Sequence, residues 1–268
     1  MTTTQAASLE SAELIGKVAI ITGAAKGLGS AISRSLAAKG AHLALCGRDV
    51  DALNKQAAEL DTDEALVIGC NVLDEESVAD LVAATIQRFG GVDILINTAG
   101  GIGPIETAVQ DYPLDGFRQV LDLNVLGTFI PCKAVVPQLI QRGGGRIVNI
   151  AGTSGLHGYA NRIGYSSSKW AVRGLTRTLA LELGKYGITA NTICPNVTHG
   201  ARMDKIIAGK AQRLTKTPEE VYADFTAETA LGRFIDDVDI AAAVNYLVGE
   251  SGRNVTGQDI VVDAGFRI

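Results

Sequence analysis

The chain has 268 residues, of which 47% are hydrophobic and 20% are charged, a balance typical of a soluble globular domain with a large core. Its net charge of −5 lacks the basic footprint that nucleic-acid binding requires, so we expect no nucleic-acid partner. The three histidines are scattered and form no cluster of metal-ligand spacing, so we expect no metal.

Residues 1–14 lack the basic-then-apolar order of a signal peptide. We expect them to form a flexible tail ahead of one catalytic domain at 15–268. No apolar run approaches the roughly 18 residues of a membrane span, so we expect no membrane contact. At least three of the four cysteines fall in apolar runs, which favours small buried side chains in a reducing compartment: Cys46, Cys70, Cys132 and Cys194. The protein is therefore expected to be cytoplasmic.

A short β-branched run at 17–22 is a candidate buried strand. It ends in the turn Gly23-Ala-Ala-Lys-Gly27-Leu-Gly29, and a helical pattern then continues to about Lys39. Glycines let the backbone turn sharply and approach a phosphate, toward which the first N–H groups of the helix point. Three glycines in the T-G-x-x-x-G-x-G spacing after a strand therefore indicate a dinucleotide-binding turn.

Strand-like and helix-like segments alternate along the rest of the chain. We expect strands at 42–46, 65–69, 92–97, 146–150, 188–194 and 258–263, and helices at 50–59, 75–89, 113–141 (interrupted near 124–127), 163–186 and 236–248. Such alternation predicts a single α/β domain with a Rossmann-type doubly wound parallel sheet and helices on both faces. Residues 199 to about 229 break the alternation, and we expect them to form a lid over the substrate.

Tyr165 and Lys169 lie one turn apart in the predicted helix at 163–186, so their side chains should stand one above the other. A free tyrosine has a pKa of about 10. A cation within ~4–6 Å favours the phenolate and lowers that pKa. The pair is therefore a candidate general acid/base near pH 7. By itself the pair is a weak signal, because Tyr and Lys one turn apart also occur on solvated helix faces.

Taken together and in order, the motifs resemble those of the short-chain dehydrogenase/reductase family from about residue 14 to 268. The matching stretches are Thr22-Gly-Ala-Ala-Lys-Gly-Leu-Gly29, Asn97-Thr-Ala-Gly100, Asn124, Tyr165-x-x-x-Lys169, Pro195, and Thr256-Gly-Gln ending in Val262-Asp263. The resemblance implies a sheet of about seven strands, a nicotinamide cofactor and a homo-oligomer, usually a tetramer and otherwise a dimer.

The resemblance also implies a mechanism. Tyr165 would exchange a proton with the hydroxyl or carbonyl oxygen of a secondary alcohol or ketone while hydride moves between the substrate and the nicotinamide. Lys169 would lower the pKa of Tyr165 and hold the nicotinamide ribose, and Asn124 would support a water that links Lys169 to solvent. The expected cofactor contacts are Thr22, Gly23, Ala25, Lys26, Gly27, Leu28, Gly29, Arg48, Asn71, Val72, Asn97, Ala99, Gly100, Tyr165, Lys169, Pro195, Val197 and Thr198. The expected substrate wall comprises Gly152, His157, Tyr159, Arg162, His199 and Met203.

One feature of the second predicted strand bears on cofactor choice. Members of the family that prefer NAD carry an acidic residue at its end, whereas this chain has Gly47 followed by Arg48, and its glycine turn holds Lys26. Two cations suit a 2′-phosphate. We therefore expect NADP(H) to be preferred, with NAD(H) as the alternative if Asp49 turns inward.

Three positions depart from the family pattern. Thr98 stands where the family usually has Asn, and Asn196 follows Pro195 in place of Gly. The third position is the catalytic serine, expected thirteen residues before the tyrosine, where this chain has Gly152. Because residues two apart on an extended chain point the same way, we expect Ser154 to donate to the substrate oxygen, with Thr153 as second choice. The rival interpretation is a nucleotide-binding scaffold or sensor that has lost catalysis.

Overall fold

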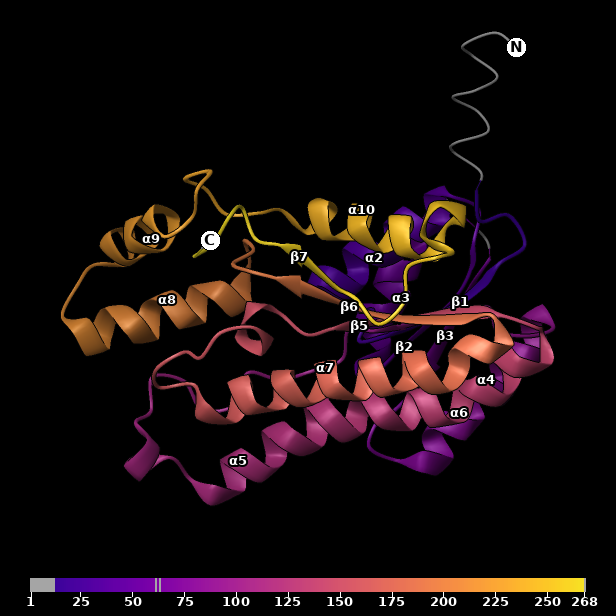
Figure 1. Cartoon of the computed structure of the whole chain (residues 1–268), viewed down its shortest axis with the longest axis horizontal. Coiled ribbons are helices and arrows are strands. Elements are labelled where there is room, and N and C mark those ends of the chain that lie inside the picture. The colour runs from indigo at the N-terminus through magenta and orange to yellow at the C-terminus, as the bar shows by residue number, and fades with distance from the viewer. Residues whose placement is uncertain (1–12, 61, 63, 268) are drawn as a thin grey trace, which may run out of the picture.

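The computed structural model describes residues 13–60, 62 and 64–267, so residues 1–12 of the expected tail lie outside it. Within the described residues the chain forms one seven-stranded sheet in the order β3-β2-β1-β4-β5-β6-β7 (Figure 1). The strands are β1 (Val18–Thr22), β2 (His42–Gly47), β3 (Ala65–Gly69), β4 (Ile94–Asn97), β5 (Gly145–Ile150), β6 (Ile188–Pro195) and β7 (Asp259–Val262). Every neighbouring pair is parallel, which confirms the predicted doubly wound sheet.

Helices cover both faces of the sheet (Figure 1). One face carries α2 (Gly27–Ala38), α3 (Val50–Ala58) and α10 (Asp237–Val248); the other carries α4 (Glu75–Phe89), α5 (Leu114–Leu121), α6 (Gly127–Gln141) and α7 (Ile163–Leu183). Side chains alternate between the faces of a strand. Ile21 of β1 accordingly joins the apolar cluster under α2 and α10, whereas its neighbour Ile20 joins the cluster under α4 and α6. Burial on both faces explains why the strands are apolar throughout.

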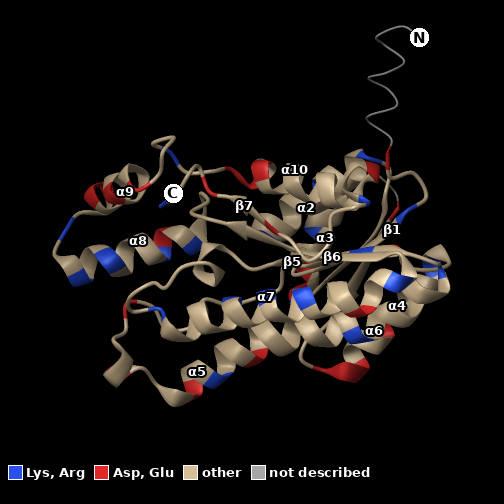
Figure 2. Ribbon diagram, in the orientation of Figure 1, with Lys and Arg blue, Asp and Glu red and all other residues tan. Residues whose placement is uncertain are grey.

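Two further helices, α8 (Ala201–Leu214) and α9 (Pro218–Ala227), stand beyond the sheet between β6 and α10 (Figure 1). They occupy the segment expected to form a lid. Ion pairs join the lid internally and to the rest of the domain. Lys216 pairs with Asp224 at 2.7 Å, where the basic end of α8 and the acidic α9 are neighbours in Figure 2. Arg213 pairs with Glu106 of the loop after β4 at 2.5 Å.

The predicted helix at 113–141 is interrupted as expected. Residues Asp122–Leu126 form a turn of π-helix between α5 and α6. The segment Leu114–Gln141 is long and apolar enough, by length and composition, to cross a membrane, since a window of 18 residues within it has a mean hydropathy of 1.4. The expectation that no run approaches a membrane span is therefore wrong by that measure. The segment packs against α4, α7, β4 and β5 and includes Pro131 and Pro137, so in this fold it is a covering helix of the sheet.

Two smaller expectations concern the tail and the cysteines. Leu14, which we placed in the tail, is only 2% exposed and packs in the core cluster under α2 and α10, so the domain begins before residue 15. All four cysteines are free and buried, as the apolar runs around them predicted.

Candidate active site

The predicted cofactor turn joins β1 to α2, at the point where the strand order reverses between β1 and β4. Gly23 and Gly27 have φ angles of +68° and +56°, which favour glycine. A Cβ on Gly29 would clash with the carbonyl of Gly23, so the third glycine allows the helix to start close against the turn. No side chain of the described residues caps the start of α2. Its first N–H groups are therefore available to the pyrophosphate of a dinucleotide, and the turn fits that ligand.

Hydrogen bonds hold the glycine turn against the loop after β4. The Thr98 hydroxyl donates to the Thr22 carbonyl at 2.5 Å, and the Ala99 N–H donates to the Thr22 hydroxyl at 3.2 Å. Thr98, the residue that departs from the family pattern, therefore has a structural role. Behind it, the buried Asn97 amide donates to Asn149 at 2.9 Å. These bonds fix the edge of the cofactor cleft.

The residues assigned to the adenosine end lie in the glycine turn and at the ends of β2 and β3. Arg48 and Lys26 are exposed, and neither has an ion-pair partner within the part of the chain that the structure describes. Asp49 accepts a hydrogen bond from the Ala52 N–H at 3.1 Å and caps α3, so its carboxylate is engaged there rather than turned toward the cleft. Asn71 is exposed, and Val72 beside it is buried.

Tyr165 and Lys169 stand one above the other near the start of α7. The Lys169 Nζ lies 5.6 Å from the centre of the Tyr165 ring and donates to the Ile150 carbonyl at 2.8 Å. Asn124 lies in the π-helical turn, and its amide bonds both the Gly101 backbone and, at 2.8 Å, the hydroxyl of Ser168. The structure therefore brings the three predicted residues together from two elements, α7 and the π-helical turn.

The charges around Tyr165 lower its pKa. Burial alone would raise that pKa, but the positive charges of Lys169, Arg202 and Arg162 outweigh burial, and a hydrogen bond from Arg202 adds to their effect. Burial also lowers the pKa of the Lys169 ammonium below its usual value. A phenol with a depressed pKa is suited to proton transfer.

The position of the absent serine faces this phenol. A Cβ at Gly152 would lie 3.9 Å from the Tyr165 hydroxyl and 3.5 Å from the Pro195 carbonyl. Residues Thr153–Gly155 form a 3₁₀ turn, whereas the expectation for Ser154 assumed an extended chain. Side chains in a 3₁₀ turn are spaced by about 120°, so residues two apart do not share a side. The premise for Ser154 is therefore wrong.

The second choice, Thr153, is buried and already engaged. Its hydroxyl lies 2.9 Å from the Tyr159 hydroxyl and donates to Asn196 at 3.2 Å. Tyr159 in turn stacks on Phe266 with ring centres 6.0 Å apart, and His157 meets the same ring edge-on. Thr153, Tyr159 and His157 therefore pack into one group with Phe266, and the place of His157 and Tyr159 in the substrate wall stays a prediction.

The expected lid contacts are placed differently. His199 packs 5.2 Å from the Phe234 ring, within an aromatic group that includes Tyr222. Met203 is buried in the apolar cluster that joins α8 to α9. Both residues hold the lid together. Pro195 ends β6. The Val197 carbonyl after it accepts a hydrogen bond from the Ile235 N–H, and Thr198 forms a parallel β-bridge with Ile235.

Sequence reasoning missed Arg202 as a site residue. Arg202 lies in the segment at 199 to about 229 that was expected to form a lid, and nothing in that segment's composition shows which residue contacts the site. In the structure the Arg202 guanidinium donates to the Gly100 carbonyl at 3.2 Å, and its charge helps to lower the pKa of Tyr165. The signal is positional: Arg202 is the first charged residue after the Gly200 turn that opens α8.

Comparison with known proteins decides the family. Residues 17–211 match the family model described as short chain dehydrogenase. The chain belongs to the short-chain dehydrogenase family. The granaticin polyketide synthase putative ketoacyl reductase 1 of Streptomyces violaceoruber is 37% identical over 92% of this chain and 92% of its own length.

Two solved structures resemble this short-chain dehydrogenase closely. A variant of actinorhodin polyketide ketoreductase with NADPH has a TM-score of 0.88 at 33% identity, covering 92% of this chain and 96% of that one. NAD⁺-bound xylitol dehydrogenase has a TM-score of 0.90 at 33% identity, covering 94% and 100%. Our chain is therefore an NAD(P)-dependent oxidoreductase that acts on alcohol and carbonyl groups.

Proposed function

We propose that this short-chain dehydrogenase transfers hydride between NADP(H) and a secondary alcohol or ketone, with Tyr165 as the general acid/base. The observation that best supports the proposal is the environment of the Tyr165 hydroxyl. It lies next to the buried cation of Lys169 and opposite the space left by Gly152, at the end of the sheet where the glycine turn can hold a dinucleotide. The same observation speaks against the rival scaffold, since a protein that only binds a nucleotide has no use for a depressed tyrosine pKa.

The chain's own groups suffice for the proton transfers. A bound nicotinamide cofactor supplies or accepts the hydride at the substrate carbon. In reduction Tyr165 gives its proton to the carbonyl oxygen, and in oxidation its phenolate takes the hydroxyl proton. Lys169 stabilises the phenolate by its charge. Asn124 holds the Gly101 backbone next to Lys169, and a water there would connect the lysine to solvent.

NADP(H) is the proposed cofactor because Arg48 and Lys26 offer unpaired positive charge at the adenosine end while Asp49 caps α3. The double variant Arg48→Ala with Lys26→Ala should lose affinity for NADP(H) by about 10- to 100-fold and keep most of its affinity for NAD(H), because only NADP(H) carries the 2′-phosphate. Titration of each cofactor into the purified protein measures both affinities.

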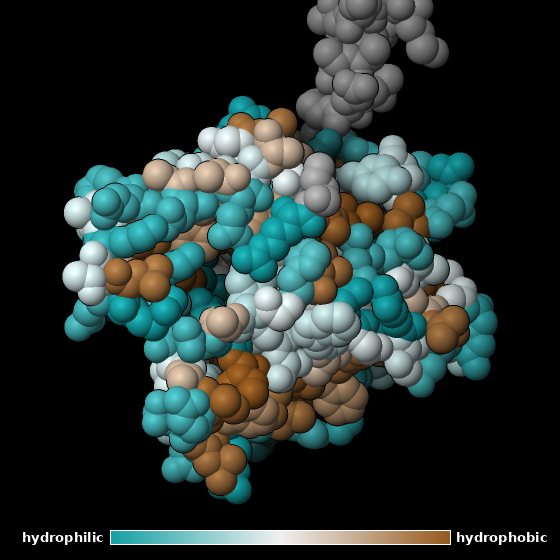
Figure 3. All heavy atoms as spheres, turned by 60° about the vertical axis from the view of Figure 1, so that its left-hand side comes forward, coloured by the Kyte–Doolittle hydropathy of each residue, from teal (hydrophilic) through white to brown (hydrophobic). Residues whose placement is uncertain are grey.

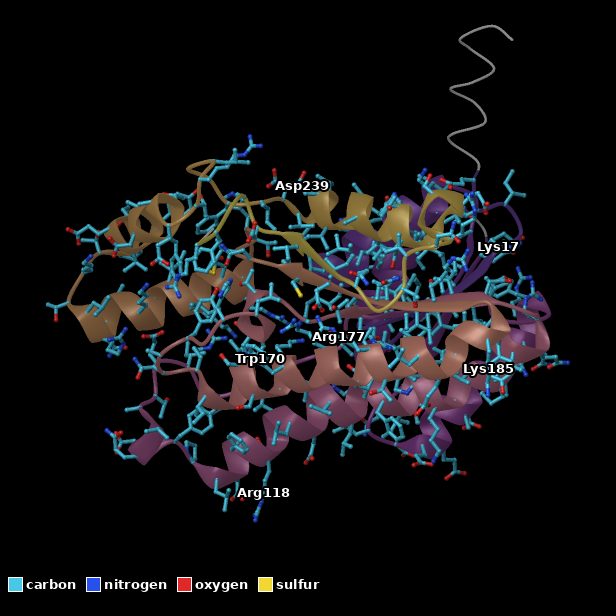
Figure 4. The ribbon with its side chains drawn as sticks, viewed as in Figure 1. Lys17, Arg118, Trp170, Arg177, Lys185 and Asp239 are labelled. Carbon is cyan, nitrogen blue, oxygen red and sulfur yellow. The ribbon has the colours of Figure 1, made fainter. Side chains whose placement is uncertain are left out.

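The matched control for that test is Lys185→Ala, which removes a cation at the far end of α7 (Figure 4). It should leave both cofactor affinities unchanged. A wild-type protein that binds NAD(H) more tightly than NADP(H), or a double variant with the wild-type ratio, would contradict the proposed cofactor choice.

Exposed apolar side chains favour a homo-oligomer. Phe129 of α6, Trp170 and Leu181 of α7 are exposed, the last at 87%, and Figure 3 shows hydrophobic atoms gathered on the lower part of the molecule, where Figure 1 has α5, α6 and α7. Burial of such surface between copies is favourable. We expect light scattering to give the mass of a dimer or tetramer, and we expect Leu181→Glu to lower that mass. A wild-type monomer at micromolar concentration would contradict this expectation.

The cytoplasmic location stays a prediction.

A further inference from the structure

Two arginines flank the Tyr165 phenol. The Arg162 guanidinium carbon lies 4.8 Å from the centre of the Tyr165 ring. Arg202 donates to the Gly100 carbonyl at 3.2 Å, and its charge helps to lower the pKa of Tyr165. The two guanidiniums are near enough that the charge of Arg202 lowers the pKa of Arg162, adding to the larger effect of burial. Together with Lys169, three cationic side chains surround one phenol.

These charges are not neutralised by the protein. Neither Arg162 nor Arg202 forms an ion pair with any carboxylate of the described residues. Arg162 is only 8% exposed, and its buried Nε has no hydrogen-bond partner in that part of the chain. The acid whose charge reaches Arg162 is Glu106, and Glu106 is already paired with Arg213 at 2.5 Å. A buried guanidinium with an unused donor is costly unless a ligand completes it.

The backbone is shaped to deliver both side chains. Arg162 precedes the first turn of α7 and follows Asn161, whose φ is +62°, a left-handed conformation that Asn tolerates better than most residues. Arg202 enters after Gly200, whose φ is +131°. The chain thus turns sharply before each arginine. Within the residues that the structure describes, the Arg162 guanidinium contacts the Tyr165 ring and forms no hydrogen bond or ion pair, so packing alone does not account for its burial.

We propose that Arg162 and Arg202 bind the carboxylate of the substrate, so that the enzyme acts on a hydroxy acid or oxo acid. Because the Arg162 guanidinium lies 4.8 Å from the centre of the Tyr165 ring, the carboxylate would sit one or two carbons from the reacting carbon. The planar fork of a guanidinium matches a carboxylate with two parallel hydrogen bonds. The space at Gly152 beside Tyr165 leaves room for such a group. This inference rests on the proposed function for the reacting carbonyl, but the anion site itself exists without it.

Binding of an unreactive dicarboxylate tests the site directly, without turnover. Malonate should bind the purified protein in calorimetric titration, with NADP⁺ present to fill the phosphate sites of the cofactor. Dimethyl malonate should not bind. Arg162→Gln and Arg202→Gln should each lower the affinity for malonate by about 10- to 100-fold, since each removes a charge-assisted hydrogen-bonded pair. The control Arg118→Gln should bind malonate as wild type does, because Arg118 projects from α5 into solvent (Figure 4) and pairs there with Asp115.

Turnover gives the second readout and separates the inference from the proposed function. Acetoacetate and methyl acetoacetate present the same ketone with and without the negative charge. Wild type should favour the acid by roughly 10²-fold in kcat/KM, and each arginine variant should reduce that ratio at least tenfold, whereas Arg118→Gln should preserve it. The ratio is informative even though Arg202 also affects Tyr165, because a change in tyrosine reactivity affects both substrates.

The outcomes differ for the two claims. In one outcome malonate binds in a way that depends on the two arginines, but no ketone or oxo acid oxidises NADPH. That outcome would support the anion site and refute the oxidoreductase proposal. Turnover of the ester as fast as the acid, with no binding of malonate, would overturn the anion site and leave the oxidoreductase intact. Sulfate binding at least tenfold tighter than malonate would also overturn the carboxylate assignment, since sulfate lacks the planar fork.

Discussion

Replacing Tyr165 with phenylalanine should lower the turnover of this enzyme by about 10²- to 10⁴-fold, the usual contribution of general acid/base catalysis. The variant removes only the hydroxyl, so the ring that contacts Arg162 and Lys169 stays in place. Affinity for the cofactor should remain near wild type. The measurement is the initial rate of NADPH oxidation with saturating substrate, together with a titration of the cofactor.

Two further variants test whether the loss of turnover is specific to the Tyr165 hydroxyl and its charge environment. Tyr246→Phe removes an exposed hydroxyl on α10 and should have wild-type turnover. Lys169→Met removes a charge that lowers the pKa of Tyr165, so that pKa should rise. Oxidation needs the phenolate, and its rate therefore rises with pH through this pKa. The rising limb of the pH profile should move to higher pH in Lys169→Met. Turnover within threefold of wild type in Tyr165→Phe would refute the mechanism.

The second large effect concerns Gly29. Gly29→Ala places a methyl group against the Gly23 carbonyl, and backbone cannot move aside cheaply. We expect the free energy of unfolding to fall by about 1–3 kcal/mol, the usual cost of overpacking. The displaced turn should also lose most of its cofactor affinity. Urea denaturation with and without NADP⁺ measures both, because a ligand that binds the folded state raises the unfolding free energy by mass action.

The control is a glycine with free space around it. Gly174 lies in the middle of α7, and a Cβ there would meet nothing within 4 Å. Gly174→Ala should raise the unfolding free energy by roughly 0.5–1 kcal/mol, because glycine in a helix loses more conformational freedom than alanine. It should also retain stabilisation by NADP⁺. Equal stability of Gly29→Ala and wild type would show that the turn accepts a side chain.

The fold was predictable because its signals are local. The helix expected at 75–89 is α4 residue for residue, since Asp74 caps its start and Gly90 ends it in the left-handed conformation. Strand limits differ by a residue or two from those expected. The lid helices were missed because their composition is polar. A signal existed in the capping box formed by Thr217 and Glu220, with Pro218 at the first turn of α9.

The site was predictable where it depends on fixed spacing and unpredictable where it depends on geometry between distant segments. Tyr165, Lys169 and Gly29 follow from motifs. The failed premise for Ser154 came from the backbone after β5, since sequence does not distinguish an extended loop from a single 3₁₀ turn. Arg202 could not be assigned to the site, because its position depends on how α8 lies over the loop at Gly100.

The π-helical turn at Asp122–Leu126 has a consequence for insertions and deletions in this chain. Such a turn holds one residue more than regular α-helix needs for the same rise. Deleting a single residue there would join α5 and α6 by one continuous ladder of hydrogen bonds. The joined helix would then be locally more stable. Because the turn absorbs the extra residue, the deletion would leave α5 and α6 close to their present relative orientation. The residues of the turn itself would change direction, and Asn124 would lose its hydrogen bonds to the Gly101 backbone. A frame-preserving loss of one codon in this segment would thus make the helix more stable and the enzyme less active.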